Sequence, residues 1–235
     1  MRALLTWVRR KFAYTDLDRE LNPPLLIPIN FRACEEKDYP RLMALYRLVS
    51  AGRFPEGDEK AFAAHLRQPE NGMIVAEIQG KIIACSGLLR LGPNIYTLCY
   101  GLVHPDYQKD RIGTTMTLLR VGRTGIGKPD TMNHLLIFAL PASLTFYRRF
   151  GFQDQGKWLA SDDKEYPFAA LSYTSYIARH IDSILQWREV RIRGNYKVPL
   201  SRTMEASLGT DGLGRESYQI DTISPALSEE PVQAV

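Results

Sequence analysis

Cysteine is scarce in this chain of 235 residues, which contains only Cys34, Cys85 and Cys99. An odd number of cysteines without metal-ligand spacing predicts neither a disulfide framework nor a zinc site. Long apolar runs are also missing, because none approaches the roughly 20 residues that cross a bilayer. We therefore expect a protein of the reducing cytoplasm, with no transmembrane segment and no bound metal.

Internal repeats and a strong charge bias are absent as well. The apolar content of 45% and the charged content of 24% are ordinary for a globular protein. The formal net charge of +4 suits an anionic ligand, but it does not by itself indicate nucleic acid. A chain of this length can bury one sizeable core, or fold as one domain of average size with appendages.

The stretch from Val103 to Thr115 carries most of the functional information. The apolar run at 95–103 suits a β-strand, and Pro105 ends it because proline cannot donate to a sheet ladder. Asp110 can cap a helix that follows, in which apolar residues recur at helical spacing. The predicted arrangement is a strand, a short loop and a helix.

Such a junction suits an anion, because unpaired backbone N–H groups and the positive end of a helix dipole meet there. Lys109 and Arg111 add two cations, and Gly113 lets a ligand approach the backbone closely. The residues alone leave two interpretations open. One is a phosphate-binding site, and the other is an ordinary turn with solvated charges.

The sequence Val-His-Pro-Asp-Tyr-Gln-x-x-x-Ile-Gly-Thr in this stretch resembles the acyl-CoA-binding motif of the GNAT superfamily of N-acyltransferases. The family pattern is Arg or Gln, two residues, Gly, one residue, then Gly or Ala. Gln108 and Gly113 match it, while Arg111 occupies the place of the first Gly. The resemblance implies either that Arg111 swings out and pairs with phosphate, or that binding is weakened.

A second stretch, residues 145–152, carries the other half of the resemblance. GNAT proteins often have an aromatic residue or Leu, then Tyr, two residues, an apolar residue and Gly-Phe at this point. The sequence Phe-Tyr-Arg-Arg-Phe-Gly-Phe matches that pattern, with Tyr147 as its tyrosine. The two motifs, with one strand between them, are more specific than either alone. The resemblance covers about residues 27–175.

The hydrophobic periodicity predicts an order of elements that also matches the GNAT fold. The expected segments are a strand at 27–32, helices at 38–51 and 58–67, strands at 73–78, 81–91 and 95–103, a helix after Asp110, a strand at 135–140, a helix at 141–150, and strands at 152–159 and 168–173. We therefore expect an α/β (α+β) fold with a GNAT-like mixed, splayed central sheet flanked by helices, followed by an extra C-terminal helix near 176–192 and a tail that is mobile or draped over the surface.

The predicted organisation is a basic N-terminal arm (1–26), a GNAT-like acyltransferase domain (27–175) and a C-terminal helix and tail (176–235). The arm has apolar residues near helical spacing among Arg and Lys. One interpretation is a helix that contacts an anionic membrane surface or RNA. The other, which we favour, is an arm that packs on the domain or on a second subunit, so a homodimer is one expectation.

Two parallel strands joined by a crossover helix form a crevice at their carboxyl ends, where ligands of open α/β sheets bind. If those strands splay apart, their free backbone groups can bind a pantetheine arm like an added strand. A backbone N–H near the end of the first strand can then stabilise an oxyanion. The implied cofactor-binding residues are Leu102, Val103, Gln108, Lys109, Asp110, Arg111, Ile112, Gly113, Thr114 and Thr115.

Tyr147 is the candidate catalytic residue, as a general acid that protonates the departing thiolate. Its alternative role is that of a core aromatic. No general base can be assigned, because the strand at 95–103 contains no Asp or Glu. The resemblance implies an N-acetyltransferase that moves an acetyl (acyl) group from acetyl-CoA, or another acyl-CoA, to a primary amine of a small molecule or peptide. The alternative is a catalytically weak or inactive acyl-CoA-binding regulatory module.

Overall fold

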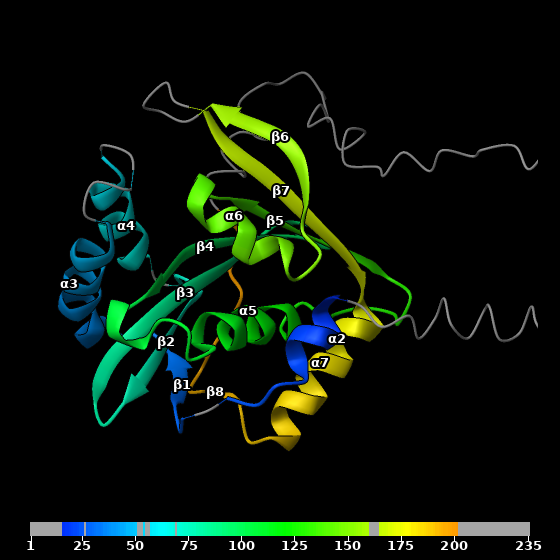
Figure 1. Cartoon of the computed structure of the whole chain (residues 1–235), viewed down its shortest axis with the longest axis horizontal. Helices are drawn as coiled ribbons and strands as arrows, with labels where there is room; N and C mark the ends of the chain where they lie inside the picture. Colours follow the sequence, from blue (N-terminus) through cyan, green and yellow to red (C-terminus); the bar gives the residue numbers. More distant parts are fainter. Residues whose placement is uncertain are drawn as a thin grey trace, which may run out of the picture. The chain divides into compact units, whose positions relative to one another are not determined.

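The structure is a computed structural model, and it describes residues 16–25, 27–50, 54, 57–68, 70–159 and 165–201. The chain divides into two compact units, Met1–Leu200 and Ser201–Val235. The fold described below belongs to the first unit (Figure 1). The amphipathic helix predicted in the first 15 residues and the predicted tail beyond residue 201 lie outside the described residues.

The elements follow the predicted order from the first strand to the last hairpin. They are α2 (Asp16–Leu21), β1 (Asn30–Ala33), η1 (Glu36–Asp38), α3 (Tyr39–Ser50), α4 (Asp58–Leu66), β2 (Met73–Ile78), β3 (Lys81–Gly92), β4 (Ile95–Val103), η2 (Pro105–Tyr107), α5 (Ile112–Gly122), β5 (Met132–Phe138), α6 (Pro141–Arg148), β6 (Gln153–Leu159), β7 (Glu165–Thr174), α7 (Ser175–Trp187) and β8 (Ile192–Arg193). The prediction of element order is therefore confirmed.

Some boundaries differ from those predicted. The first strand begins only at Asn30, and the strand predicted at 135–140 is β5, which begins at Met132. The C-terminal helix ends at Trp187 instead of continuing to residue 192. It ends there because Glu189 takes a left-handed backbone conformation (φ +60°), which a right-handed helix does not accommodate. The chain then forms β8, which pairs in parallel with β1.

The strands form one sheet in the order β6-β7-β5-β4-β3-β2-β1-β8. Antiparallel pairing dominates, and the parallel pairs are β4 with β5 and β1 with β8. The crossover between β4 and β5 is made by α5. Pairing between these two strands runs from Ile95 to Leu98 only, so the remainder of β4 separates from β5. The predicted mixed, splayed sheet is confirmed.

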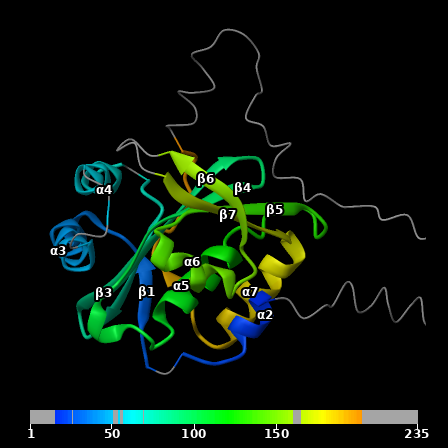
Figure 2. The same cartoon turned by 45° about the horizontal axis from the view of Figure 1, so that its top comes forward.

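Helices cover both faces of the sheet, and two separate cores result (Figure 2). The helices α3 and α4 cover one face, in an apolar cluster that includes Leu42, Phe62 and Cys85. The helices α5 and α7 cover the other face, in a larger cluster that includes Met116 and Ile181. The β4–β5 gap therefore opens between two helical layers.

The described part of the N-terminal arm, α2, also packs on the second of these faces. Leu17 and Leu21 are 1% and 3% exposed and belong to the cluster around α5. Arg188, which follows α7, donates a hydrogen bond to the Leu21 carbonyl. Membrane contact, RNA contact and dimerisation of the arm stay predictions. Among the helices that the structure describes, none is long and apolar enough to cross a membrane.

A buried ion network joins β1, β2 and η1. Arg32 donates to Asp38 at 2.6 and 2.9 Å and to Glu77 at 2.8 Å. The Asp38 side chain is 0% exposed. Burial alone would raise the pKa of Asp38, but hydrogen bonds from Arg32 and the Glu35 N–H, with the Arg32 charge, lower it below its ordinary value. This stabilisation is present above the unfolded-state pKa and is lost as the pH falls through the lower, folded-state pKa.

We predict that Arg32→Met destabilises the protein by about 3–5 kcal/mol, because it leaves the buried Asp38 carboxylate unpaired. Urea unfolding at neutral pH measures the change. Arg47→Met is the control, since the Arg47–Glu59 pair is exposed and is worth at most about 1 kcal/mol. If both variants lost the same small amount of unfolding free energy, the buried network would contribute no more than an exposed ion pair.

Candidate functional site

The centre of the site is a β-bulge in β4. Gly87 on β3 pairs with Cys99, whereas Cys85 pairs with Leu102, so one residue of β3 opposes two of β4. The extra residue is accommodated by Tyr100, whose backbone is left-handed (φ +47°). A bulge bends its strand and increases the local twist. It lies where β4 separates from β5, and we attribute the separation to it.

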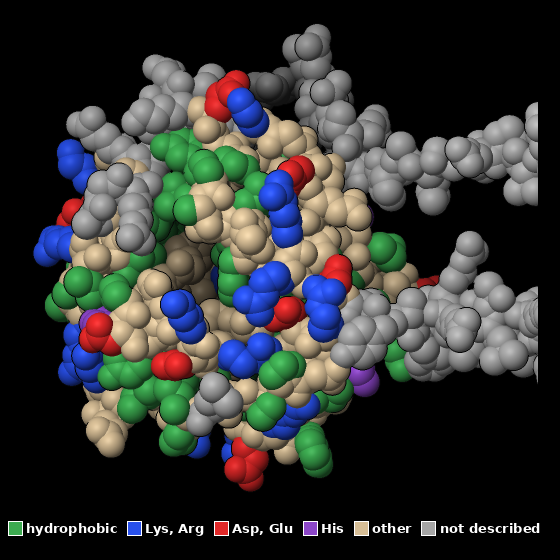
Figure 3. Space-filling model, viewed as in Figure 1, with side chains coloured by type: hydrophobic (Ala, Val, Ile, Leu, Met, Phe, Trp, Pro, Cys, Tyr) green, Lys and Arg blue, Asp and Glu red, His purple; other side chains and the backbone are tan. Residues whose placement is uncertain are grey.

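The separated part of β4 borders an open hollow. Residues 99–103 have no partner on β5, and Gly101 is exposed although it lies inside the central strand. Figure 3 shows a hollow in this face between the places of β4 and α6, with Lys and Arg side chains around it. Backbone groups that lack a neighbouring strand are available to an extended ligand.

The loop after β4 and the first turn of α5 form the second part of the site. The helix begins at Ile112, and its first hydrogen bond runs from the Thr115 N–H to the Arg111 carbonyl. The N–H groups of the first turn therefore have no carbonyl partner within the helix. The prediction that Asp110 caps α5 is wrong: the N-cap residue is Arg111, and no side chain caps this end.

Arg111 has a left-handed backbone (φ +63°), which explains why the family pattern has Gly at this place. Lys109, two residues earlier, is also left-handed (φ +76°). Left-handed residues in a loop turn successive N–H groups toward one concave side, a geometry that binds anions. The Arg111 side chain does swing out, but it donates to the Glu20 carbonyl of α2 at 2.5 Å.

The other predicted cofactor-binding residues surround this loop. The side chain of Gln108 donates back to the Val103 carbonyl at 3.2 Å and so fixes the end of β4. Lys109 is exposed and Asp110 is partly exposed. In the first turn, three residues have side chains that face the core, namely Ile112 (1% exposed), Thr114 (4%) and Thr115 (7%). At these positions only the backbone groups are available to a ligand.

Tyr147, on α6, faces the bulged part of β4. A Cβ built on Gly101 would lie 3.3 Å from the Tyr147 hydroxyl, so the hydroxyl faces the exposed backbone of the bulge. The Tyr147 ring packs edge-on against Phe146 and Phe152. The two alternatives from the sequence thus concern different atoms of this residue, and the general-acid role stays a prediction. The ring is part of the core, and the hydroxyl borders the crevice.

The opposite face of the bulge carries a group of side chains that the sequence did not reveal. His65 of α4 lies with Nε2 4.0 Å from the Cys99 sulfur and its ring 5.1 Å from that of Tyr100. Burial lowers the pKa of His65, although a backbone hydrogen bond with Asn71 opposes the shift, so the imidazole is neutral at pH 7. Burial raises the pKa of Cys99 to about 12, so its sulfur is a thiol.

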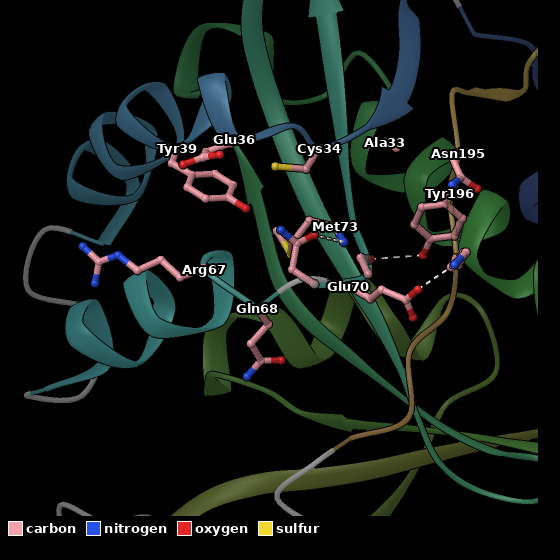
Figure 4. Close-up of a pocket in the computed structure, with 13 residues that line it drawn as sticks. Ala33, Cys34, Glu36, Tyr39, Arg67, Gln68, Glu70, Met73, Asn195 and Tyr196 are labelled. Atoms are coloured by element: carbon pink, nitrogen blue, oxygen red, sulfur yellow. Dashed lines mark hydrogen bonds and ion pairs between the residues drawn. The ribbon is translucent and has the colours of Figure 1, made fainter.

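A separate cavity of about 510 Å³ lies on the α3–α4 face, near the start of β2. Figure 4 shows Tyr39 and Arg67 on one side of it and Tyr196 on the other. No residue of the two motifs lines it. The sequence did not predict this cavity because its walls come from segments that are far apart in the chain, namely 33–39, 67–73 and 195–197.

No group of three His, Cys, Asp or Glu side chains that could hold a metal ion is found within the described residues. The crevice itself offers backbone groups of β4, the Tyr147 hydroxyl and nearby Lys and Arg side chains.

Comparison with known proteins agrees with this geometry. Residues 69–154 match the family described as "Acetyltransferase (GNAT) domain". Among solved structures, a GNAT-family acetyltransferase from Staphylococcus aureus Mu50 is similar at 17% identity and a TM-score of 0.51, over 62% of this chain and 99% of that one. The loading GNATL domain of CurA from Lyngbya majuscula is similar at 12% identity and a TM-score of 0.51, over 63% and 98%.

A third similar structure is Ard1 from Thermoplasma volcanium, at 11% identity and a TM-score of 0.50, over 62% of this chain and 98% of that one. None of the curated proteins matches this chain in sequence. The resemblance found in the two motifs is confirmed: residues 69–154 match the GNAT acetyltransferase domain, and the fold is similar to that of GNAT proteins. The match to this domain is evidence for acyl transfer from an acyl-CoA.

We predict that Gly101→Val closes the crevice, because its Cβ would stand 3.3 Å from the Tyr147 hydroxyl. Calorimetry should show an affinity for CoA lowered on the order of tenfold or more, as expected from an overpacking cost of about 1–3 kcal/mol. Gly92→Val is the matched control, since a Cβ on Gly92 meets nothing within 4 Å. Unchanged CoA affinity in the Gly101 variant would place the ligand elsewhere.

Proposed function

We propose that this protein is an N-acetyltransferase that moves an acetyl group, or another acyl group, from acyl-CoA to a primary amine of a small molecule or peptide. The observation that carries the proposal is the crevice at the β4 bulge. There β4 beyond Leu98 has no partner on β5, the Tyr147 hydroxyl faces Gly101, and Gly113 in the first turn of α5 lies against Phe146 of α6.

The fit to acyl-CoA follows from the three parts of the site. The left-handed loop of Lys109 and Arg111, with the free N–H groups of the first turn of α5, suits the pyrophosphate. Gly113 lies against Phe146, whose nearest ring carbon would be 3.4 Å from an added Cβ, and so α5 and α6 approach closely at the mouth. The free edge of β4 suits the two amides of the pantetheine arm.

The reaction proceeds by direct attack of the amine nitrogen on the thioester carbonyl. A backbone N–H near Leu102 or Val103 stabilises the oxyanion of the tetrahedral intermediate. As the intermediate collapses, the C–S bond breaks and Tyr147 donates its hydroxyl proton to the departing thiolate sulfur. The new N–C bond leaves an amide, and the proton lost by the amine returns to solvent, while Tyr147 regains a proton from water.

Two measurements on the full chain test this function. Calorimetry with CoA establishes binding, and a thiol-detecting dye then records CoA release from acetyl-CoA with a set of amines: polyamines, amino acids and peptides with a free N-terminus or lysine. We expect CoA binding and amine-dependent release. Binding without release above background hydrolysis would favour the inactive regulatory module, and absence of binding would refute both.

We predict that Tyr147→Phe keeps the affinity for CoA and lowers kcat by about 100-fold or more, because a general acid contributes at least that factor. The ring packing against Phe146 and Phe152 is retained in this variant. Steady-state kinetics with the best amine measure the effect. Tyr176→Phe, at an exposed position of α7, should behave like the wild type. An unchanged kcat would remove the general-acid role.

A further inference from the structure

Arg149 is a residue of the second motif to which neither the motif nor the proposed chemistry gives a role. It follows the last residue of α6 and occupies one of the two variable places after Tyr147. Its Nε and Nη2 atoms donate to the two carboxylate oxygens of Glu20 at 3.3 and 2.5 Å. Its guanidinium also lies 5.8 Å from the centre of the Phe146 ring.

These contacts place Arg149 at the mouth of the crevice. Phe146, over which Arg149 lies, contacts Gly113 in the first turn of α5. Arg111, the N-cap residue of the same helix, donates to the Glu20 carbonyl. Two arginines from the two motifs therefore meet at one residue of α2, beside the N-terminus of α5.

Among the described residues, the charges of this cluster are not balanced. The Glu20 carboxylate, on a side chain that is 9% exposed, pairs with Arg149, whereas Arg111 is bonded to the backbone carbonyl of Glu20. Burial lowers the pKa of Arg111, and the Arg149 charge acts in the same direction while Glu20 opposes it, so each arginine lies within the field of the other. The positive end of the α5 dipole adds to the excess. An anion at this point would offset the repulsion.

The Arg149 guanidinium also has N–H donors that the pair with Glu20 does not use. Its side chain is 46% exposed, and Glu20 engages Nε and Nη2, so Nη1 is not used in the pair with Glu20. A guanidinium carries five N–H donors in a fixed fork that matches the oxygens of a phosphate. Glu20 already holds this fork in one orientation, so little side-chain entropy remains to be lost when a ligand binds.

We infer that Arg149 binds a phosphate group of acyl-CoA, with Arg111 beside it and Glu20 holding the fork in place. The inference rests on the proposed function, because it needs the nucleotide half of acyl-CoA at the mouth of the crevice. Two sources of that phosphate exist in the ligand, namely the 3′-phosphate of the ribose and the pyrophosphate.

The experiment is calorimetry on the full chain with CoA and with 3′-dephospho-CoA, which lacks only the 3′-phosphate. In Arg149→Gln we expect the affinity for CoA to fall about tenfold to 100-fold, as for loss of a charge-assisted hydrogen-bond pair. A loss confined to CoA assigns the contact to the 3′-phosphate, and an equal loss for both ligands assigns it to the pyrophosphate. Either result supports the inference.

Arg148→Gln is the matched control, because Arg148 is the preceding residue, is exposed, and pairs with Asp154 at a distance from Glu20. It should bind both ligands like the wild type. Since Arg149→Gln leaves Glu20 buried without its partner, the double variant Glu20→Gln, Arg149→Gln is measured as well and should show the same loss. The inference is overturned if the double variant keeps wild-type affinity for both ligands, or if Arg148→Gln loses as much.

The two levels of the proposal fail in different ways. If the wild-type chain does not bind CoA, the proposed function itself is refuted. If the wild type binds CoA and the Arg149 variants bind it equally well, only the role of Arg149 is refuted and the acyltransferase function stands.

Discussion

The separation of β4 from β5 is the constraint on which the rest of the structure depends. A parallel pair that continued past Leu98 would satisfy the backbone groups of residues 99–103 and leave no edge for a ligand. The left-handed conformation of Tyr100 is unfavourable for a bulky residue. Packing offsets that cost, because the Tyr100 ring lies 4.7 Å from that of Phe62 and 5.1 Å from that of His65. The α4 helix thus supports the opening of the crevice from the opposite face of the sheet.

The parts of the fold that could be predicted are those set by local pattern. The bounds of β4 follow from its apolar run and from Pro105, and the order of elements follows from periodicity. The bulge could not be predicted, because nothing in the local sequence shows that Tyr100 rather than a glycine adopts a positive φ. Nor could the hydrogen bond from Arg111 to Glu20, since it joins residues 91 positions apart. The first motif identified the loop, but the partners of its side chains, such as those of Arg111 and Gln108, are known only from the fold.

The position of α2 explains why an arginine can replace the glycine of the family pattern at residue 111. A left-handed arginine costs roughly 1–2 kcal/mol relative to glycine. A hydrogen bond from a charged donor returns about 1.5–3 kcal/mol, and Arg111 makes one to the Glu20 carbonyl. The α2 helix is held there by the burial of Leu17 and Leu21, which keeps the Glu20 carbonyl in place as the acceptor for Arg111. In a chain without α2 the same arginine would carry the backbone cost with no partner, and glycine would be the better residue. The α2 helix therefore allows this loop to carry an arginine where the family pattern has glycine.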